Sequence, residues 1–135
     1  MNLSGRLLSA LLLLSNFCSA QGGWQNIYPI QSNSPYGDGI DAVRQTADGG
    51  YILAGMSEMN SAASQNRVVK VNDQGIIQWS NSYASVGNYS WATNIEIAPD
   101  GGFFVEGYRI NPATFAREVY LQRLDANGNQ IWLNF

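Results

Sequence analysis

Residues 46–55 read TADGGYILAG and residues 98–107 read APDGGFFVEG, so one pattern occurs twice at a shift of 52 residues. A second pattern follows each copy: residues 68–79 read VVKVNDQGIIQW and residues 121–132 read LQRLDANGNQIW, at a shift of 53 residues. A repeat at a fixed period of this size indicates one structural unit used more than once. We therefore expect two units, at residues 24–78 and 79–131, and the start of a third at residues 132–135.

Each unit contains short β-branched and aromatic runs that are bounded by Asp, Asn and Gly, which is the pattern of strands and turns. The expected strands are residues 40–46, 51–57, 67–72 and 76–83 in the first unit, and residues 91–98, 103–109, 119–125 and 130 onward in the second. The turns DANG and NDQG place a polar residue first and Gly last, as tight hairpins require. The sequence therefore predicts an all-β fold of four-stranded antiparallel meanders, each matching one β-propeller blade.

The two copies resemble the repeats of large secreted bacterial proteins, which read D-G-G-Y-I-x-x-G and then Lys-x-Asp-x-x-Gly-x-x-x-Trp. Many such proteins come from Bacteroidetes-type organisms and end in a sorting domain for type IX secretion. The resemblance covers nearly all of the chain after residue 20 and implies propeller blades in a secreted protein. Asn72 stands where the pattern has Asp, and these 135 residues include no sorting domain, so the route of secretion stays open.

A Trp-x-Asn motif occurs at Trp24, Trp79 and Trp132, and the third copy lies at the end of the sequence. Because an aromatic residue that recurs at the blade period is typical of packing, we expect the rings of Trp79 and Trp132 to wedge between blades rather than to bind a ligand. A propeller closes with about four to eight blades. We therefore expect a fragment of a longer propeller, with the assembly of several short chains as the alternative. Its partners would be the missing blades or further copies of itself.

The first 20 residues have the pattern of a signal peptide. Arg6 precedes an apolar run at residues 7–14, and Cys18-Ser-Ala20 fits a signal-peptidase site, so the mature chain would begin at Gln21. The apolar run is shorter than the roughly 20 residues that span a bilayer, so we expect no membrane span. Residues 15–17 lack the pattern that precedes a lipidated cysteine. The sequence predicts a protein that is secreted or held at the cell surface without disulfides.

Composition excludes several functions. The net charge is −3 and the basic residues are scattered, which disfavours nucleic-acid binding. The chain has no His, and its one Cys lies in the predicted signal peptide, so histidine triads, thiol nucleophiles and His/Cys zinc sites are excluded. We expect no cofactor. Four carboxylates could form a glycosidase pair, but nothing in the sequence fixes their separation: Asp38, Asp41, Glu96 and Glu106.

Two short segments are candidate sites. Asp125, Asn127 and Asn129 place oxygen ligands at alternate positions, like the start of a calcium loop, but the closing Glu is missing and a turn is the simpler interpretation. The stretches 58–66 and 110–118 differ most between the copies, and loops on a rigid scaffold often bind partners. The second stretch carries Phe115 and Arg117, which suit a polar or glycan partner.

Two functions remain open. The first is a secreted or cell-surface propeller module that binds protein or glycan, with no catalytic constellation in view. The alternative is a fragment of a secreted propeller enzyme, such as a carbohydrate-active one, whose catalytic residues lie outside these 135 residues. Both functions occur on propellers, so the fold does not choose between them.

Overall fold

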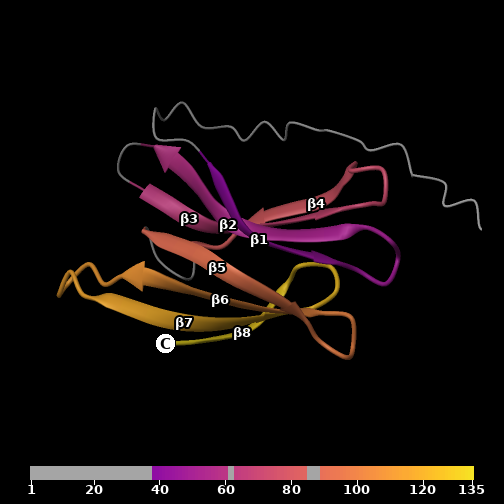
Figure 1. Cartoon of the computed structure of the whole chain (residues 1–135). Coiled ribbons are helices and arrows are strands. Elements are labelled where there is room, and N and C mark those ends of the chain that lie inside the picture. The colour runs from indigo at the N-terminus through magenta and orange to yellow at the C-terminus, as the bar shows by residue number, and fades with distance from the viewer. Residues whose placement is uncertain (1–37, 61–62, 85–88) are drawn as a thin grey trace, which may run out of the picture.

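The structure, a computed structural model, describes residues 38–60, 63–84 and 89–135. The predicted signal peptide, Cys18 and the first Trp-x-Asn motif lie outside these ranges. The elements are eight strands: β1 (Gly39–Gln45), β2 (Tyr51–Asn60), β3 (Ala63–Val71), β4 (Ile77–Ser82), β5 (Ser90–Ile97), β6 (Phe103–Ile110), β7 (Arg117–Leu124) and β8 (Gln130–Asn134). They form two antiparallel sheets in chain order, β1-β2-β3-β4 and β5-β6-β7-β8 (Figure 1). The expected all-β fold of two four-stranded meanders is confirmed.

The hairpin turns repeat one geometry. The β1–β2 turn is closed by hydrogen bonds from Thr46 N to Gly50 O and from Gly49 N to Thr46 O, both at 2.9 Å, and the β3–β4, β5–β6 and β7–β8 turns have the same pair. Each turn places a glycine at a positive φ, which side chains disfavour; these glycines are Gly49, Gly75, Gly101 and Gly128. The turns that DANG and NDQG predict are therefore present, and each is fixed by local sequence.

The structure corrects two predicted boundaries. Residues 58–66 are mostly strand rather than loop, because β2 and β3 keep pairing as far as Asn60 and Ala63. The four residues expected to begin a third unit instead close the second sheet: Trp132 lies in β8 and pairs with Arg123 of β7. The reason is the turn before β8, which sends the chain back along β7. Trp79 pairs with Lys70 in the same way, so the Trp-x-Asn motif ends a sheet.

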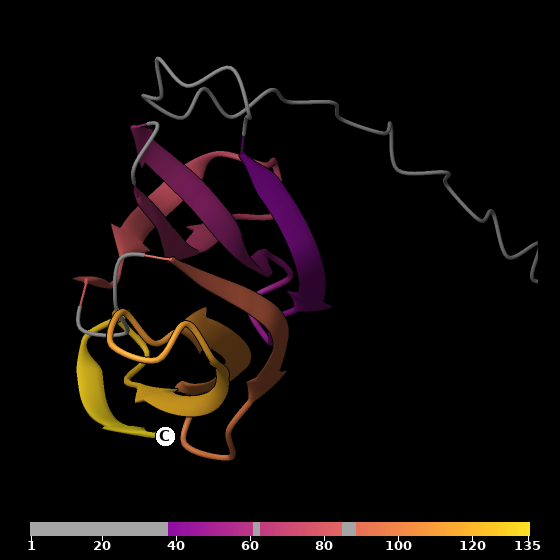
Figure 2. The same cartoon turned by 90° about the vertical axis from the view of Figure 1, so that its left-hand side faces the viewer.

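The two sheets pack face to face, and β5 lies against β1, β2 and β3 of the first sheet (Figure 2). The core is the layer between them, since its buried side chains come from both sheets: Ala42, Ile52, Ala54, Val68, Tyr83, Ala92, Ile95, Phe103, Val105, Tyr120 and Leu124. Trp79 packs against this layer with its ring centroid 6.0 Å from that of Phe103. The expectation that Trp79 acts as a wedge between units is confirmed.

An ion pair inside each sheet explains the Asp-Gly-Gly motif. Lys70 is buried, and its Nζ donates to Asp48 Oδ2 at 2.9 Å. Arg123 is buried in the equivalent place, and its Nη2 donates to Asp100 Oδ1 at 2.5 Å. A Cβ on Gly102 would lie 2.4 Å from Leu124 O and equally close to Arg123 Nη1. The second glycine of the pair is therefore required by packing.

Candidate binding site between the sheets

Two bulges at equivalent places shape the site. In β1, Ile40 pairs with Gly55 and Ala42 pairs with Ala54, which leaves Asp41 as an extra residue. In β5, Thr93 is the extra residue in the same way, 52 positions later. The strands approach very closely beside each bulge, because a Cβ on Gly55 or Gly107 would lie 1.9 Å from a carbonyl oxygen of the neighbouring strand. Bulges re-aim side chains and are frequent beside functional sites.

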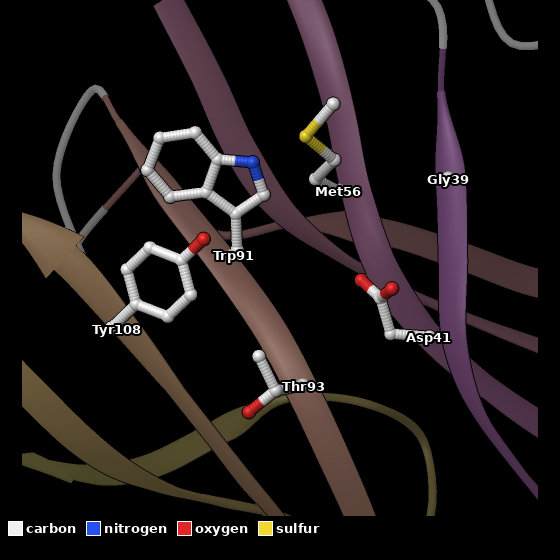
Figure 3. A pocket seen from close by; sticks show the side chains of 6 residues that line it. All are labelled: Gly39, Asp41, Met56, Trp91, Thr93 and Tyr108. Carbon is white, nitrogen blue, oxygen red and sulfur yellow. The ribbon is translucent and has the colours of Figure 1, made fainter.

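Both bulged residues line a pocket between the sheets, which we call the interface pocket. It has a volume of about 460 Å³, which is within the usual range for small-molecule sites. Strands β1 and β2 of the first sheet and β5 and β6 of the second supply its six lining residues: Gly39, Asp41, Met56, Trp91, Thr93 and Tyr108. Figure 3 shows the two aromatic rings side by side, with Met56 and Asp41 on the opposite wall.

An aromatic stack forms the second-sheet wall of the interface pocket. Trp91 and Tyr108 pair across β5 and β6, and their rings lie 5.0 Å apart with an interplanar angle of 22°. The Arg117 guanidinium carbon lies 4.3 Å above the centroid of the Tyr108 ring. This cation–π contact restrains Tyr108 from the side of β7. Trp91 and Tyr108 are each half-buried, so the stack is fixed in place and still reaches the pocket.

The polar side chains of the interface pocket carry a single charge. Asp41 is the one charged residue among the six that line it, and its side chain is exposed. The Thr93 hydroxyl donates to the carbonyl oxygen of Glu106 at 3.4 Å, which leaves its lone pairs to accept. A pocket with one carboxylate, two hydroxyls (Thr93 and Tyr108) and an aromatic wall suits a ligand that has both apolar faces and hydroxyl or amino groups.

Neither predicted binding residue, Phe115 or Arg117, lines the interface pocket. Arg117 contacts it indirectly through Tyr108. Phe115 occupies the β6–β7 turn with 82% of its surface exposed and φ at 57°, a region that non-glycine residues seldom adopt. The turn is held by Asn111, whose N donates to Ala116 O and whose carbonyl oxygen accepts from Phe115 N. Phe115 is therefore exposed on a hydrogen-bonded turn.

The predicted metal candidates form a hairpin turn. Asp125 Oδ1 accepts from the backbone N of Asn127 and of Asn129, each at 2.8 Å, and Asp125 Oδ2 accepts from the Asn129 side chain at 2.9 Å. These contacts, the Asn129 side chain first, lower the pKa of Asp125. Both carboxylate oxygens thus serve the turn. Within the described ranges, no group of three or more His, Cys, Asp or Glu residues could hold a metal ion.

The four carboxylates considered for catalysis have different surroundings. Glu96 Oε1 accepts from Arg44 Nη2 at 2.6 Å across the two sheets, and this hydrogen bond lowers the pKa of Glu96. Glu106 is exposed on β6, and Asp38 directly precedes β1. Of the four, Asp41 alone lines the interface pocket.

Sequence reasoning missed Trp91 and Tyr108, although the repeat held a signal for them. These residues occupy the positions that Gly39 and Met56 hold in the first unit. Residues required by the strand geometry recur in both copies, so a gain of two aromatic residues in one copy marks a local specialisation. The bulges that bring the four positions together are not visible in the sequence.

No protein-family model matches the chain, and no curated protein matches it either. Among the residues that the structure describes, there is also no helix of the length and apolar character needed to cross a bilayer.

Proposed function

We propose that this protein is a secreted or cell-surface binding module that holds a glycan in the interface pocket. The observation that carries the proposal is the Trp91–Tyr108 stack facing a lone carboxylate, Asp41. Sugar rings present apolar C–H faces that stack on aromatic rings, and their hydroxyl groups bond to carboxylates and side-chain hydroxyls. With Asp41 as the one charged lining residue, the pocket favours a neutral or amino sugar over an anionic ligand.

Binding fits the pocket better than hydrolysis. Glycoside hydrolysis uses two carboxyl groups on either side of the scissile bond, about 5–10 Å apart. Asp41 is the single carboxylate among the six lining residues. The proposal therefore assigns Asp41 to hydrogen bonding with the ligand, not to acid–base chemistry.

Two further features belong to this proposal. The sheets are consecutive units of one repeat, and the first strands β1 and β5 lie next to each other, which supports a radial arrangement of propeller blades. Residues 1–20 support export, since they have the signal-peptide pattern. Sequencing the N-terminus of the exported protein checks the second point. We expect the mature chain to start at Gln21, and an uncleaved N-terminus would contradict this.

The test is a titration of the chain with soluble oligosaccharides, after a glycan array has identified a ligand. Trp91→Ala should weaken binding by about tenfold or more, the value of one aromatic stacking contact, while Trp91→Phe should retain part of it. Asp41→Ala should also weaken binding. Trp132→Ala is the matched control, because it removes an exposed tryptophan far along the chain in β8. Equal affinity in the wild type and in a folded Trp91→Ala variant would exclude the interface pocket as the site.

A further inference from the structure

The junction between the two sheets is closed by a three-residue clasp that consists of Trp79, Asn81 and Tyr83. The Asn81 side chain and the Tyr83 hydroxyl both donate to the carbonyl oxygen of Gly128, at 3.1 and 2.7 Å. Burial raises the pKa of Tyr83 to about 12, so its hydroxyl stays protonated. A Cβ on Gly128 would lie 2.7 Å from the Trp79 ring. The clasp therefore binds the β7–β8 turn of the following unit and requires glycine at position 128.

The second sheet carries the same clasp positions. Trp132 and Asn134 follow Trp79 and Asn81 by 53 residues, and Trp132 pairs with Arg123 just as Trp79 pairs with Lys70. Within the described part of the chain, no turn covers them. Trp132 is 36% exposed, and Asn134 is exposed.

The sheet face beside these positions is uncovered as well. Val68 is fully buried between the sheets, whereas Leu121, its equivalent in the second sheet, is 42% exposed. Asn66 is also fully buried, and its equivalent Val119 is 67% exposed. One repeat thus presents the same face twice, once packed against the next sheet and once open.

We propose that the outer face of β7 and β8 binds another four-stranded unit of this same repeat, whose Asp/Asn-x-x-Gly turn enters the clasp at Trp132 and Asn134. The established junction supplies the geometry, because equivalent residues already hold such a turn within the chain. In this arrangement the Asn134 side-chain amide donates to the carbonyl oxygen of the glycine in that turn, as Asn81 does to Gly128. The Trp132 ring then lies where a side chain on that glycine would otherwise be, as the Trp79 ring does at Gly128. This inference does not depend on the ligand of the interface pocket.

Charge and polarity further define the partner unit. At the existing junction, Arg44 of the first sheet pairs with Glu96, which holds the same repeat position in the second. The next unit should therefore place a cation at that position, to face Glu96. The existing junction also buries a hydrogen bond from Asn66 Nδ2 to Gln122 Oε1 at 2.9 Å. Because Val119 replaces Asn66, the partner should be apolar where the second sheet has Gln122.

The test extends the full chain after Phe135 with a copy of its own residues 83–135, so that the repeat register is kept. In the appended copy, the residue copied from Glu96 is replaced by Arg and that copied from Gln122 by Leu. The readout is the maleimide labelling rate of Leu121→Cys, in a background that carries Cys18→Ser. We expect the extension to slow labelling by about tenfold or more, as protection by a folded contact does. An otherwise identical extension in which the residue copied from Gly128 is Ala should protect much less.

A second measurement distinguishes docking in the clasp from nonspecific shielding of Leu121→Cys by the appended unit. Trp132 also packs against Phe104, with the ring centroids 6.2 Å apart, so Trp132→Ala should lower the thermal midpoint of both chains. The loss should be clearly larger in the extended chain, where it should approach that of Trp79→Ala. Unchanged Leu121→Cys labelling in the extended chain would overturn the proposal. An appended unit that stays unfolded would also overturn it, because the parent unit folds against the first sheet.

Discussion

At the scale of single residues, the Asp-Gly-Gly motif divides three tasks among three positions. The Asp100 carboxylate accepts from Gly102 N at 3.1 Å and from Arg123. Gly101 supplies a φ of 84°, and no atom lies within 4 Å of a Cβ placed on it. Gly102 leaves room for the carbonyl of Leu124 and for the Arg123 guanidinium. The motif recurs in both units because all three roles are set by contacts inside one sheet, and the two sheets share those contacts.

The two glycines should therefore respond differently to substitution. Gly102→Ala pushes a Cβ against backbone and should lower the free energy of unfolding by about 2 kcal/mol or more. Gly101→Asn meets no neighbour, and Asn tolerates the left-handed region, so its cost should stay near 1 kcal/mol or below. Urea denaturation of the two variants checks the order. Equal losses would show that turn conformation, not packing, sets the requirement at both positions.

Acid should weaken the fold through Asp48. The Thr46 hydroxyl and then the Lys70 ammonium lower the pKa of Asp48 from 3.8 to about 2. A carboxyl group whose pKa is lower in the folded state stabilises the fold above its unfolded pKa, and this contribution is lost as the pH falls toward the folded pKa. The urea midpoint should thus fall between about pH 4 and pH 2, and less steeply in Asp48→Asn. The same acid dependence in the variant and the wild type would contradict the assignment.

At the scale of elements, strand positions could be predicted where local chemistry sets them. The strand expected at 103–109 is Phe103–Ile110 in the structure. The two ranges agree closely because a glycine turn fixes the start of the strand. The strand expected at 67–72 begins four residues earlier, at Ala63, because cross-strand pairing extends it and the sequence does not show the pairing. The interface pocket was missed for the same reason. Its walls depend on the bulges at Asp41 and Thr93, which are properties of register.

The β6–β7 turn allows a separation of binding from stability. Phe115 has a left-handed backbone, which costs an L-residue about 1–2 kcal/mol, and strain of this kind often accompanies function. Phe115→Gly should therefore raise the free energy of unfolding by roughly 0.5–1 kcal/mol. Phe115→Ala removes the same ring but keeps the strain, so it should give no such gain. Thermal denaturation measures both variants. If both bind ligand like the wild type, Phe115 has no part in the site, and if Phe115→Gly is not stabilised, the turn carries no strain.

At the scale of the whole molecule, the two sheets are unequal although their sequences repeat. The face of the first sheet that carries Val68 packs into the core, and the equivalent face of the second sheet is open in the described structure. In stacked repeats, stability is close to a sum of unit terms and junction terms. The single junction seen here therefore holds most of the stability that the two units share.

Equivalent substitutions in the two sheets should expose this inequality. Val68→Ala opens a cavity in the junction and should lower the free energy of unfolding by roughly 2 kcal/mol. Leu121→Ala removes a larger side chain at the equivalent position, but that side chain is partly in solvent, so the loss should be about 1 kcal/mol or less. Urea denaturation gives both values, and hydrogen exchange shows where they act. Because Val68 lies in β3 and β3 contacts β5 across the junction, its loss should speed exchange in β5 of the other sheet as well as in β3. Faster exchange confined to the first sheet would mean that the sheets unfold independently and that the junction contributes little.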